Sequence, residues 1–186
     1  MSSKRAIFPI SKVNAELEDT DIPQEKIHAI VAFCRLHFSS LRQEVYELIE
    51  KGIQLAEYNA QYDALDTLLI YRAYYLLHCE QRTEAYRLCK ELLPKFLADK
   101  NFSEYGFAFT LLCQMEWSKG NLEAAFEYIK NALISLKYKR NKLQSLAYIY
   151  YIQAVFYFDL NELTLAKQFY QKSLNYLKKV APIGLL

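Results

Sequence analysis

The sequence has few of the residues that interrupt regular structure: only 4 Gly and 4 Pro occur among 186 residues. An all-β sandwich needs a turn about every 8–12 residues, so this composition excludes that class. The long stretches between the glycines and prolines are rich in Leu, Ala, Glu, Lys, Gln and Arg, which favour helices. The predicted fold class is therefore all-α.

Neither sign of charge dominates, because 23 Lys and Arg oppose 21 Asp and Glu, for a net charge of +2. Domains that bind polyanions usually concentrate a large basic excess, so the composition argues against nucleic acid as a partner. No apolar run reaches the ~18 residues of a membrane span. The N-terminal residues also lack the apolar core of a signal peptide. We therefore expect a cytoplasmic protein with no membrane partner.

Sequence signatures of catalysis and of metal binding are missing. The four cysteines have no CxxC or zinc-finger spacing, which indicates core residues in a reducing compartment. Cys34 and His37 share a helix face, but two ligands fall short of the three or four of a zinc site. HExxH, GxxxxGK[ST], GxGxxG and GxSxG are absent. The prediction is a non-enzymatic protein without a metal or a cofactor.

An internal repeat organises the chain. The segments GNLEAAFEYIKNA, which begins at Gly120, and NELTLAKQFYQKS, which begins at Asn161, align with Ala125 on Ala166, 41 residues apart. A third copy places Ala85 40 residues before Ala125, and a weaker copy reaches Val45. A period of this length is typical of stacked helix pairs. The sequence predicts four pairs, with first helices at 23–39, 61–79, 103–119 and 141–160 and second helices at 41–58, 83–97, 122–138 and 163–180.

Local signals place the ends of these helices. Gly120 and Asn161 occupy the same turn, and both residue types tolerate the left-handed conformation that ends a helix. Capping boxes are predicted at residues 21–24 and 101–104. Pro94 is expected to kink or end its helix near residue 93. Small residues should sit where paired helices cross, since they let backbones approach closely; they are Ala73, Ala85, Cys113, Ala125, Ala154 and Ala166.

These residues resemble the tetratricopeptide repeat, in which small residues mark the crossing of two antiparallel helices. The best copy carries Leu112, Gly120, Ala125, Ile129 and Ala132 in the family's places. The period of 40–41 departs from the family's usual 34 residues and is similar to long repeats in bacterial signalling regulators. The resemblance implies a right-handed α-α superhelix of about four pairs over residues 23–182. Residues 1–22 would form an N-terminal arm without helical periodicity, and 183–186 a tail.

The resemblance also implies a concave groove that binds a protein or peptide. Aromatic residues are abundant, with 16 Tyr and 11 Phe, and they suit an apolar peptide with hydrogen-bonding groups. The clamp that grips chaperone carboxylates is excluded, because its cationic positions are taken by side chains such as Ile30 and Leu111. The predicted lining of the groove is Thr67, Ile70, Tyr74, Leu77, His78, Phe107, Thr110, Gln114, Trp117, Tyr148, Tyr151, Val155 and Phe158.

Three functional hypotheses follow. The preferred one is a module that binds a protein or peptide. It would be the sensory or scaffolding region of a bacterial signalling protein, for example the N-terminal fragment of a kinase or diguanylate cyclase. The second is homodimerisation through the C-terminal helix, whose apolar stripe includes Leu174 and Leu177. The third is contact with nucleic acid through the basic turn at residues 137–142, which contains Lys137, Lys139, Arg140 and Lys142.

Overall fold

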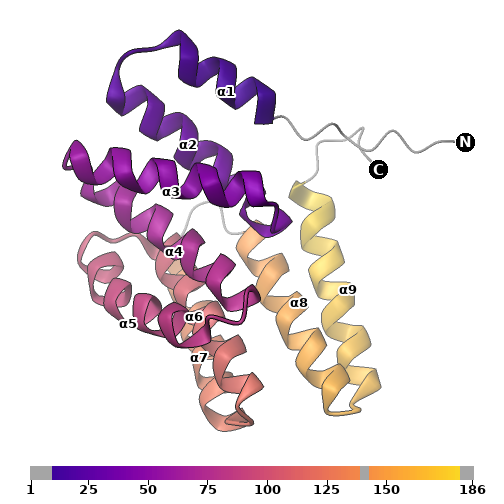
Figure 1. Cartoon of the computed structure of the whole chain (residues 1–186). Helices are drawn as coiled ribbons and strands as arrows, with labels where there is room; N and C mark the ends of the chain where they lie inside the picture. The colour runs from indigo at the N-terminus through magenta and orange to yellow at the C-terminus, as the bar shows by residue number, and fades with distance from the viewer. Residues whose placement is uncertain (1–9, 139–142, 181–186) are drawn as a thin grey trace, which may run out of the picture. The chain divides into compact units, whose positions relative to one another are not determined.

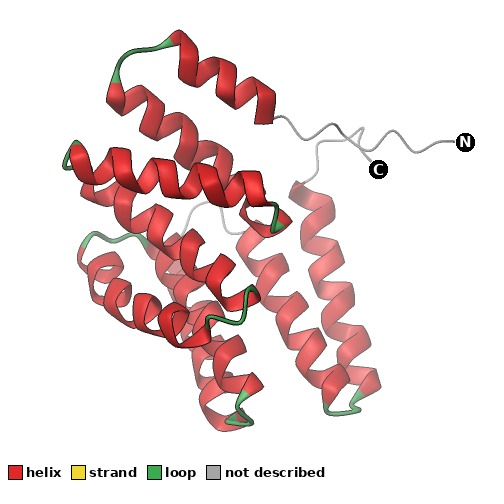
Figure 2. Ribbon diagram, viewed as in Figure 1, coloured by secondary structure: helices red, strands yellow, loops and turns green. Residues whose placement is uncertain are grey.

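The structure, a computed structural model, describes residues 10–138 and 143–180. Within them it contains nine α-helices and two short 3-10 helices and no strand (Figures 1 and 2). The all-α class is therefore confirmed, and the helices follow one another as sequential antiparallel pairs. The chain divides into two compact units, the first ending at Gln81 and the second beginning at Arg82. Each unit is described by itself.

The first unit contains four α-helices. They are α1 (Ile10–Asp19), α2 (Pro23–His37), α3 (Gln43–Tyr58) and α4 (Tyr62–His78), with a 3-10 turn at Phe38–Ser40. Helix α3 packs against both α2 and α4, and α2 also contacts α4. Gly52 makes the close approach possible. A Cβ on Gly52 would lie 2.7 Å from Ile30 Cγ2 and 2.9 Å from Leu68 Cδ1, so a larger residue would force α3 away from its neighbours.

Helix α1 corrects the expectation that the first twenty residues lack helical structure. Residues 10–19 form a helix that packs on α2. Val13 and Leu17 lie one turn apart and are 6% and 4% exposed, so they anchor the helix on its neighbour. A single pair of apolar residues four positions apart, among charged neighbours, is too little periodicity to predict a helix from the sequence.

The second unit contains five α-helices. They are α5 (Arg82–Ala98), α6 (Phe102–Ser118), α7 (Leu122–Ser135), α8 (Leu143–Asp159) and α9 (Leu163–Val180), with a 3-10 turn at Leu136–Tyr138. Helix α6 packs between α5 and α7, α9 packs along α8, and α8 also contacts α6 and α7. Cys113 and Ala125 have no exposed surface, and Ala166 is 3% exposed. The small residues predicted for the helix crossings are thus buried.

The turns between helices share one geometry. Ala60, Glu80, Lys100 and Gly120 follow one another at intervals of twenty residues, and each has positive φ, as does Asn161. In each turn the next residue's amide donates to the carbonyl five positions back, for example Asn121 N to Glu116 O at 3.0 Å. This bond is the helix-ending arrangement that a left-handed residue allows. The prediction for Gly120 and Asn161 is confirmed, and the 40-residue period resolves into two 20-residue halves.

Other local predictions differ from the structure or lie outside it. Helix α5 continues past Pro94 to Ala98, close to the predicted bounds of 83–97, so Pro94 does not end the helix near residue 93. The predicted capping boxes do not form, because the helix caps are Ile22 and Asn101 and neither makes a side-chain cap bond. Residues 1–9 of the arm, the 183–186 tail and residues 139–142 of the basic turn lie outside the described residues.

Candidate binding face on α6 and α8

The predicted lining residues of the first unit are mostly core. Ile70 has no exposed surface, and Tyr74 is buried with Thr67 and Leu77. The Tyr74 ring meets Phe38 edge-on, with 5.0 Å between ring centroids, and lies 4.5 Å from the ring of His78. Neither Ile70 nor Tyr74 therefore offers an accessible surface in this structure.

His78 is the exposed member of this group. Partial burial of its imidazole lowers the pKa of His78 below its ordinary value. The side chain is therefore neutral at pH 7 and can donate or accept a hydrogen bond without carrying a charge.

In the second unit, α6 and α8 bring several predicted residues together. The rings of Phe107 and Tyr148 lie 6.0 Å apart. Gln114 Nε2 is 3.3 Å from the Tyr148 hydroxyl and 3.3 Å from Thr110 O. The Thr110 hydroxyl donates to Gly106 O at 2.9 Å, and Thr110 is only 1% exposed. The Thr110 side chain thus bonds within α6, while Phe107, Gln114 and Tyr148 form a partly exposed surface between α6 and α8.

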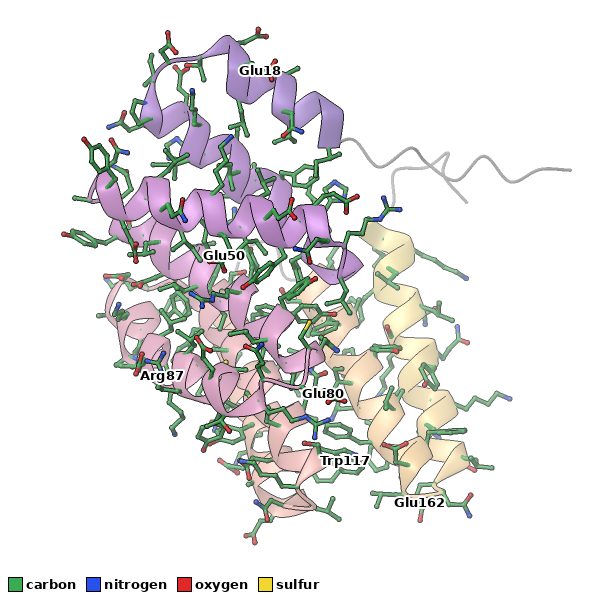
Figure 3. The ribbon with its side chains drawn as sticks, viewed as in Figure 1. Glu18, Glu50, Glu80, Arg87, Trp117 and Glu162 are labelled. Carbon is green, nitrogen blue, oxygen red and sulfur yellow. The ribbon has the colours of Figure 1, made fainter. Side chains whose placement is uncertain are left out.

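Trp117 is held from two sides near the end of α6 (Figure 3). Its ring stacks on Phe156 of α8, with 3.8 Å between centroids and an interplanar angle of 1°. Its indole N–H donates to Asp159 Oδ2 at 3.1 Å. Phe126 of α7 meets both rings edge-on. An indole fixed by stacking and by a charge-assisted hydrogen bond loses little conformational freedom when a ligand contacts it.

Three predicted residues continue this surface along α8. Tyr151 and Phe158 are 46% and 59% exposed, and Val155 is partly buried between them. Positions i, i+4 and i+7 share one helix face, so the three side chains form a strip. We call the whole surface the α6–α8 face: Phe107, Gln114, Trp117, Tyr148, Tyr151, Val155 and Phe158.

Asp159 is a residue of the candidate site that the sequence analysis did not single out. A carboxylate in the last turn of a helix is unfavourable, because the carbonyl end of the helix dipole is negative. An acidic residue at that position therefore signals a partner elsewhere, which the structure shows to be Trp117.

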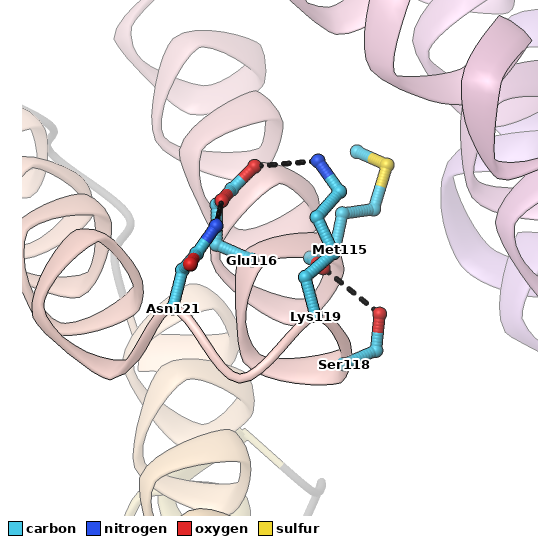
Figure 4. Close-up of polar contacts among 5 residues, drawn as sticks. All are labelled: Met115, Glu116, Ser118, Lys119 and Asn121. Atoms are coloured by element: carbon cyan, nitrogen blue, oxygen red, sulfur yellow. Dashed lines mark hydrogen bonds and ion pairs between the residues drawn. The ribbon is translucent and has the colours of Figure 1, made fainter.

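Glu116 is a second missed residue, at the turn between α6 and α7 (Figure 4). Its side chain is buried, and its two carboxylate oxygens accept from Lys119 Nζ at 2.8 Å and from Asn121 Nδ2 at 2.6 Å. These hydrogen bonds lower the pKa of Glu116 below its ordinary value. Lys119 Nζ also lies 4.4 Å from the ring centroid of Tyr86 on α5. The carboxylate thus ties the turn together and has a structural role.

The described residues contain no grouped metal ligands, and two of their thiols are protonated at neutral pH. In residues 10–138 and 143–180, no three His, Cys, Asp or Glu side chains are grouped so that they could hold a metal ion. Burial raises the pKa of Cys34 and Cys89 to about 12, so both thiols are protonated at neutral pH and are poor nucleophiles. The described helices include none that is long and apolar enough to cross a membrane.

Comparison with known proteins leaves the family open. No protein-family model matches the chain, and neither a curated protein nor a solved structure matches it. The fold defines the class at the level of an all-helical protein built from sequential antiparallel helix pairs.

Proposed function

We propose that this chain is a non-enzymatic module that binds a protein or peptide on the α6–α8 face. The observation that carries the proposal is the pairing of exposed aromatic side chains with fixed ones. Tyr151 and Phe158 of α8 are about half exposed, whereas Trp117 of α6 is held by Phe156 and Asp159 of that same helix α8. Large aromatic side chains next to anchored polar groups are typical of binding hot spots.

The chemistry of this face defines the ligand class. Phe107, Val155 and Phe158 favour apolar or aromatic ligand side chains, and the Gln114 amide with the Tyr148 hydroxyl supplies hydrogen-bond donors and acceptors. The face carries one carboxylate at its edge, Asp159, and its oxygen already accepts from Trp117. We therefore propose an extended or helical peptide with large apolar side chains.

The finer architecture belongs to the same proposal. The sequential helix pairs and the turn geometry that five of their connections share support a tetratricopeptide-like, right-handed superhelix. We further propose a cytoplasmic sensory or scaffolding role in a bacterial signalling protein. That role rests on the sequence resemblance alone.

A peptide display selection tests the binding function. A random peptide library is selected on the full chain, and each recovered peptide is titrated against Tyr151→Ala and Phe158→Ala by fluorescence anisotropy. Loss of a hot-spot aromatic should weaken binding about tenfold or more. Tyr58 is 90% exposed on α3, so Tyr58→Ala is the matched control and should leave the affinity unchanged. Equal affinity for all three variants would contradict the proposed face.

A further inference from the structure

The helix pair α8–α9 carries an exposed apolar surface. Leu163, Leu174 and Leu177 of α9 are 57%, 50% and 46% exposed. Tyr170 lies on the same side of α9, and its ring is 6.0 Å from that of Tyr151 on α8. We call this surface the end face: Tyr151, Phe158, Leu163, Tyr170, Leu174 and Leu177. It shares two side chains with the α6–α8 face, but its leucines all belong to α9.

The internal repeat shows what kind of element fits such a surface. A shift of 41 residues places Thr110, Ile129 and Leu136 of the preceding pair on Tyr151, Tyr170 and Leu177. In the preceding pair these three positions are 1%, 3% and 2% exposed, and α8 packs against both of its helices, α6 and α7. The equivalent positions of the α6–α7 pair are thus buried, while among the described residues those of the α8–α9 pair belong to an exposed surface.

Helix α8 itself defines the complementary pattern. Phe156 stacks on Trp117, and Ile149 and Ile152 lie two turns and one turn before it on the same side of the helix. All three are 2–5% exposed. A helix with apolar residues at positions i, i+3 and i+7 therefore suits this type of surface.

Charge decides which helix the end face would accept. Helix α9 contains four lysines and no acidic residue. Lys172 and Lys179 lie over aromatic rings, at 4.6 Å from Phe169 and 5.5 Å from Tyr176. Lys167 and Lys178 are exposed and border Leu174. Lys167 lies two helical turns before Leu174, and Lys178 lies one turn after it. The rim of the end face is therefore positive along α9, and its acidic neighbours, Asp159 and Glu162, lie at the turn before this helix.

We propose that the end face docks an acidic amphipathic helix of a partner protein, with apolar residues at i, i+3 and i+7 and carboxylates beside them. A second copy of this chain fits less well. A two-fold interface places the same patch on both sides, so α9 would oppose α9 and bring lysines against lysines. The end face overlaps the α6–α8 face at Tyr151 and Phe158, but its test relies on lysines and leucines of α9 that the α6–α8 face lacks, so a negative result here leaves the proposal for the α6–α8 face standing.

Two designed helical peptides test the proposal with the full chain. Both carry Ile, Ile and Phe at i, i+3 and i+7 in an alanine-rich host, one with Glu and the other with Lys at the flanking positions. The Glu peptide should bind in an anisotropy titration, and the Lys peptide should bind at least about tenfold more weakly. Lys167→Glu with Lys178→Glu should reverse this preference. Equal binding of the two peptides, or binding of neither, would overturn the proposal.

Leucine variants locate the binding site and test self-association. Leu174→Gln with Leu177→Gln should abolish binding of the Glu peptide, and melting by circular dichroism reports whether the double variant is folded. Leu97 of α5 is 52% exposed, so Leu97→Gln is the matched control and should bind like the parent chain. The parent chain should sediment as a monomer. A dimer that dissociates in the Leu174 and Leu177 double variant would overturn the proposal in favour of a second copy.

Discussion

Gly106 marks a close approach of α6 and α7, and its replacement tests the packing of these two helices. A Cβ on Gly106 would overlap the Ser135 hydroxyl oxygen and would lie 3.5 Å from Ala132 O. Ser135 is 3% exposed, and its hydroxyl donates to Ala132 O at 2.7 Å. The methyl group of Gly106→Ala would therefore displace a buried, hydrogen-bonded atom.

The expected loss follows from three contributions. Overpacking costs about 1–3 kcal/mol, and loss of the Ser135 hydrogen bond costs about 1 kcal/mol. Alanine in place of a helical glycine returns about 1 kcal/mol. Gly106→Ala should thus lower the free energy of unfolding by about 1–3 kcal/mol, measured by urea denaturation with far-UV circular dichroism.

A second variant separates the steric cause from a general effect. Ser135→Ala removes the hydroxyl oxygen, and the new Cβ would then face Ser135 Cβ at 3.7 Å, an ordinary contact. The double variant should therefore be more stable than Gly106→Ala alone, with a coupling energy of about 2 kcal/mol in the double-mutant cycle. Additive losses from the two substitutions would refute the steric reasoning.

Three further predictions concern single positions. Lys100 and Gly120 both have positive φ, 56° and 82°, which glycine adopts more readily than other residues. In thermal melts Lys100→Gly should therefore stabilise the chain and Gly120→Ala should destabilise it, each by about 0.5–1 kcal/mol. Glu116→Gln should cost about 1–2 kcal/mol at neutral pH. The folded-state pKa of Glu116 is lowered from its ordinary value of 4.5, so the carboxylate stabilises the fold above pH 4.5 and this stabilisation is lost as the pH falls through the folded-state pKa. The urea midpoint of Glu116→Gln should therefore fall less on acidification than that of the parent chain. Gln153 Oε1 is buried and has no hydrogen-bond partner, so Gln153→Met should stabilise by about 1 kcal/mol; a lower urea midpoint would contradict this.

The helices were predictable because their signals are local. Every described turn between neighbouring helices from α3 to α7, and the turn after α8, places its positive-φ residue two positions before the first residue of the next helix. Helix α9 has the predicted bounds of 163–180. Spacing of small residues also located the crossings, since a backbone approach tolerates no larger side chain.

Other features depend on tertiary context. Pro94 is exposed, and α5 continues beyond it, because packing of the helix outweighs the hydrogen bond that proline lacks. Asn101 and Glu104 have the spacing of a capping box, but Glu104 is 3% exposed and therefore lies within the packed interior. A local motif cannot show which of its side chains the neighbouring helices will enclose.

The candidate site was predictable only in part, because its helices are apolar on nearly every side. Helix α8 has aromatic or aliphatic residues in all directions, so the sequence does not show which of them face α6 and which face α9. The structure separates Phe156, which stacks on Trp117, from Phe158, which is 59% exposed. The bond between Trp117 and Asp159 spans 42 positions, and no local pattern encodes such a contact.

Photo-crosslinking tests the central claim most directly. A photoreactive amino acid replaces Phe158 in one sample and Tyr58, an exposed aromatic residue of α3, in another. Each chain is irradiated with a peptide recovered by display selection, and the crosslinked product is located by mass spectrometry. Binding on the α6–α8 face predicts a crosslink from position 158 and none from position 58. A bound peptide that crosslinks from position 58 and not from position 158 would contradict the account.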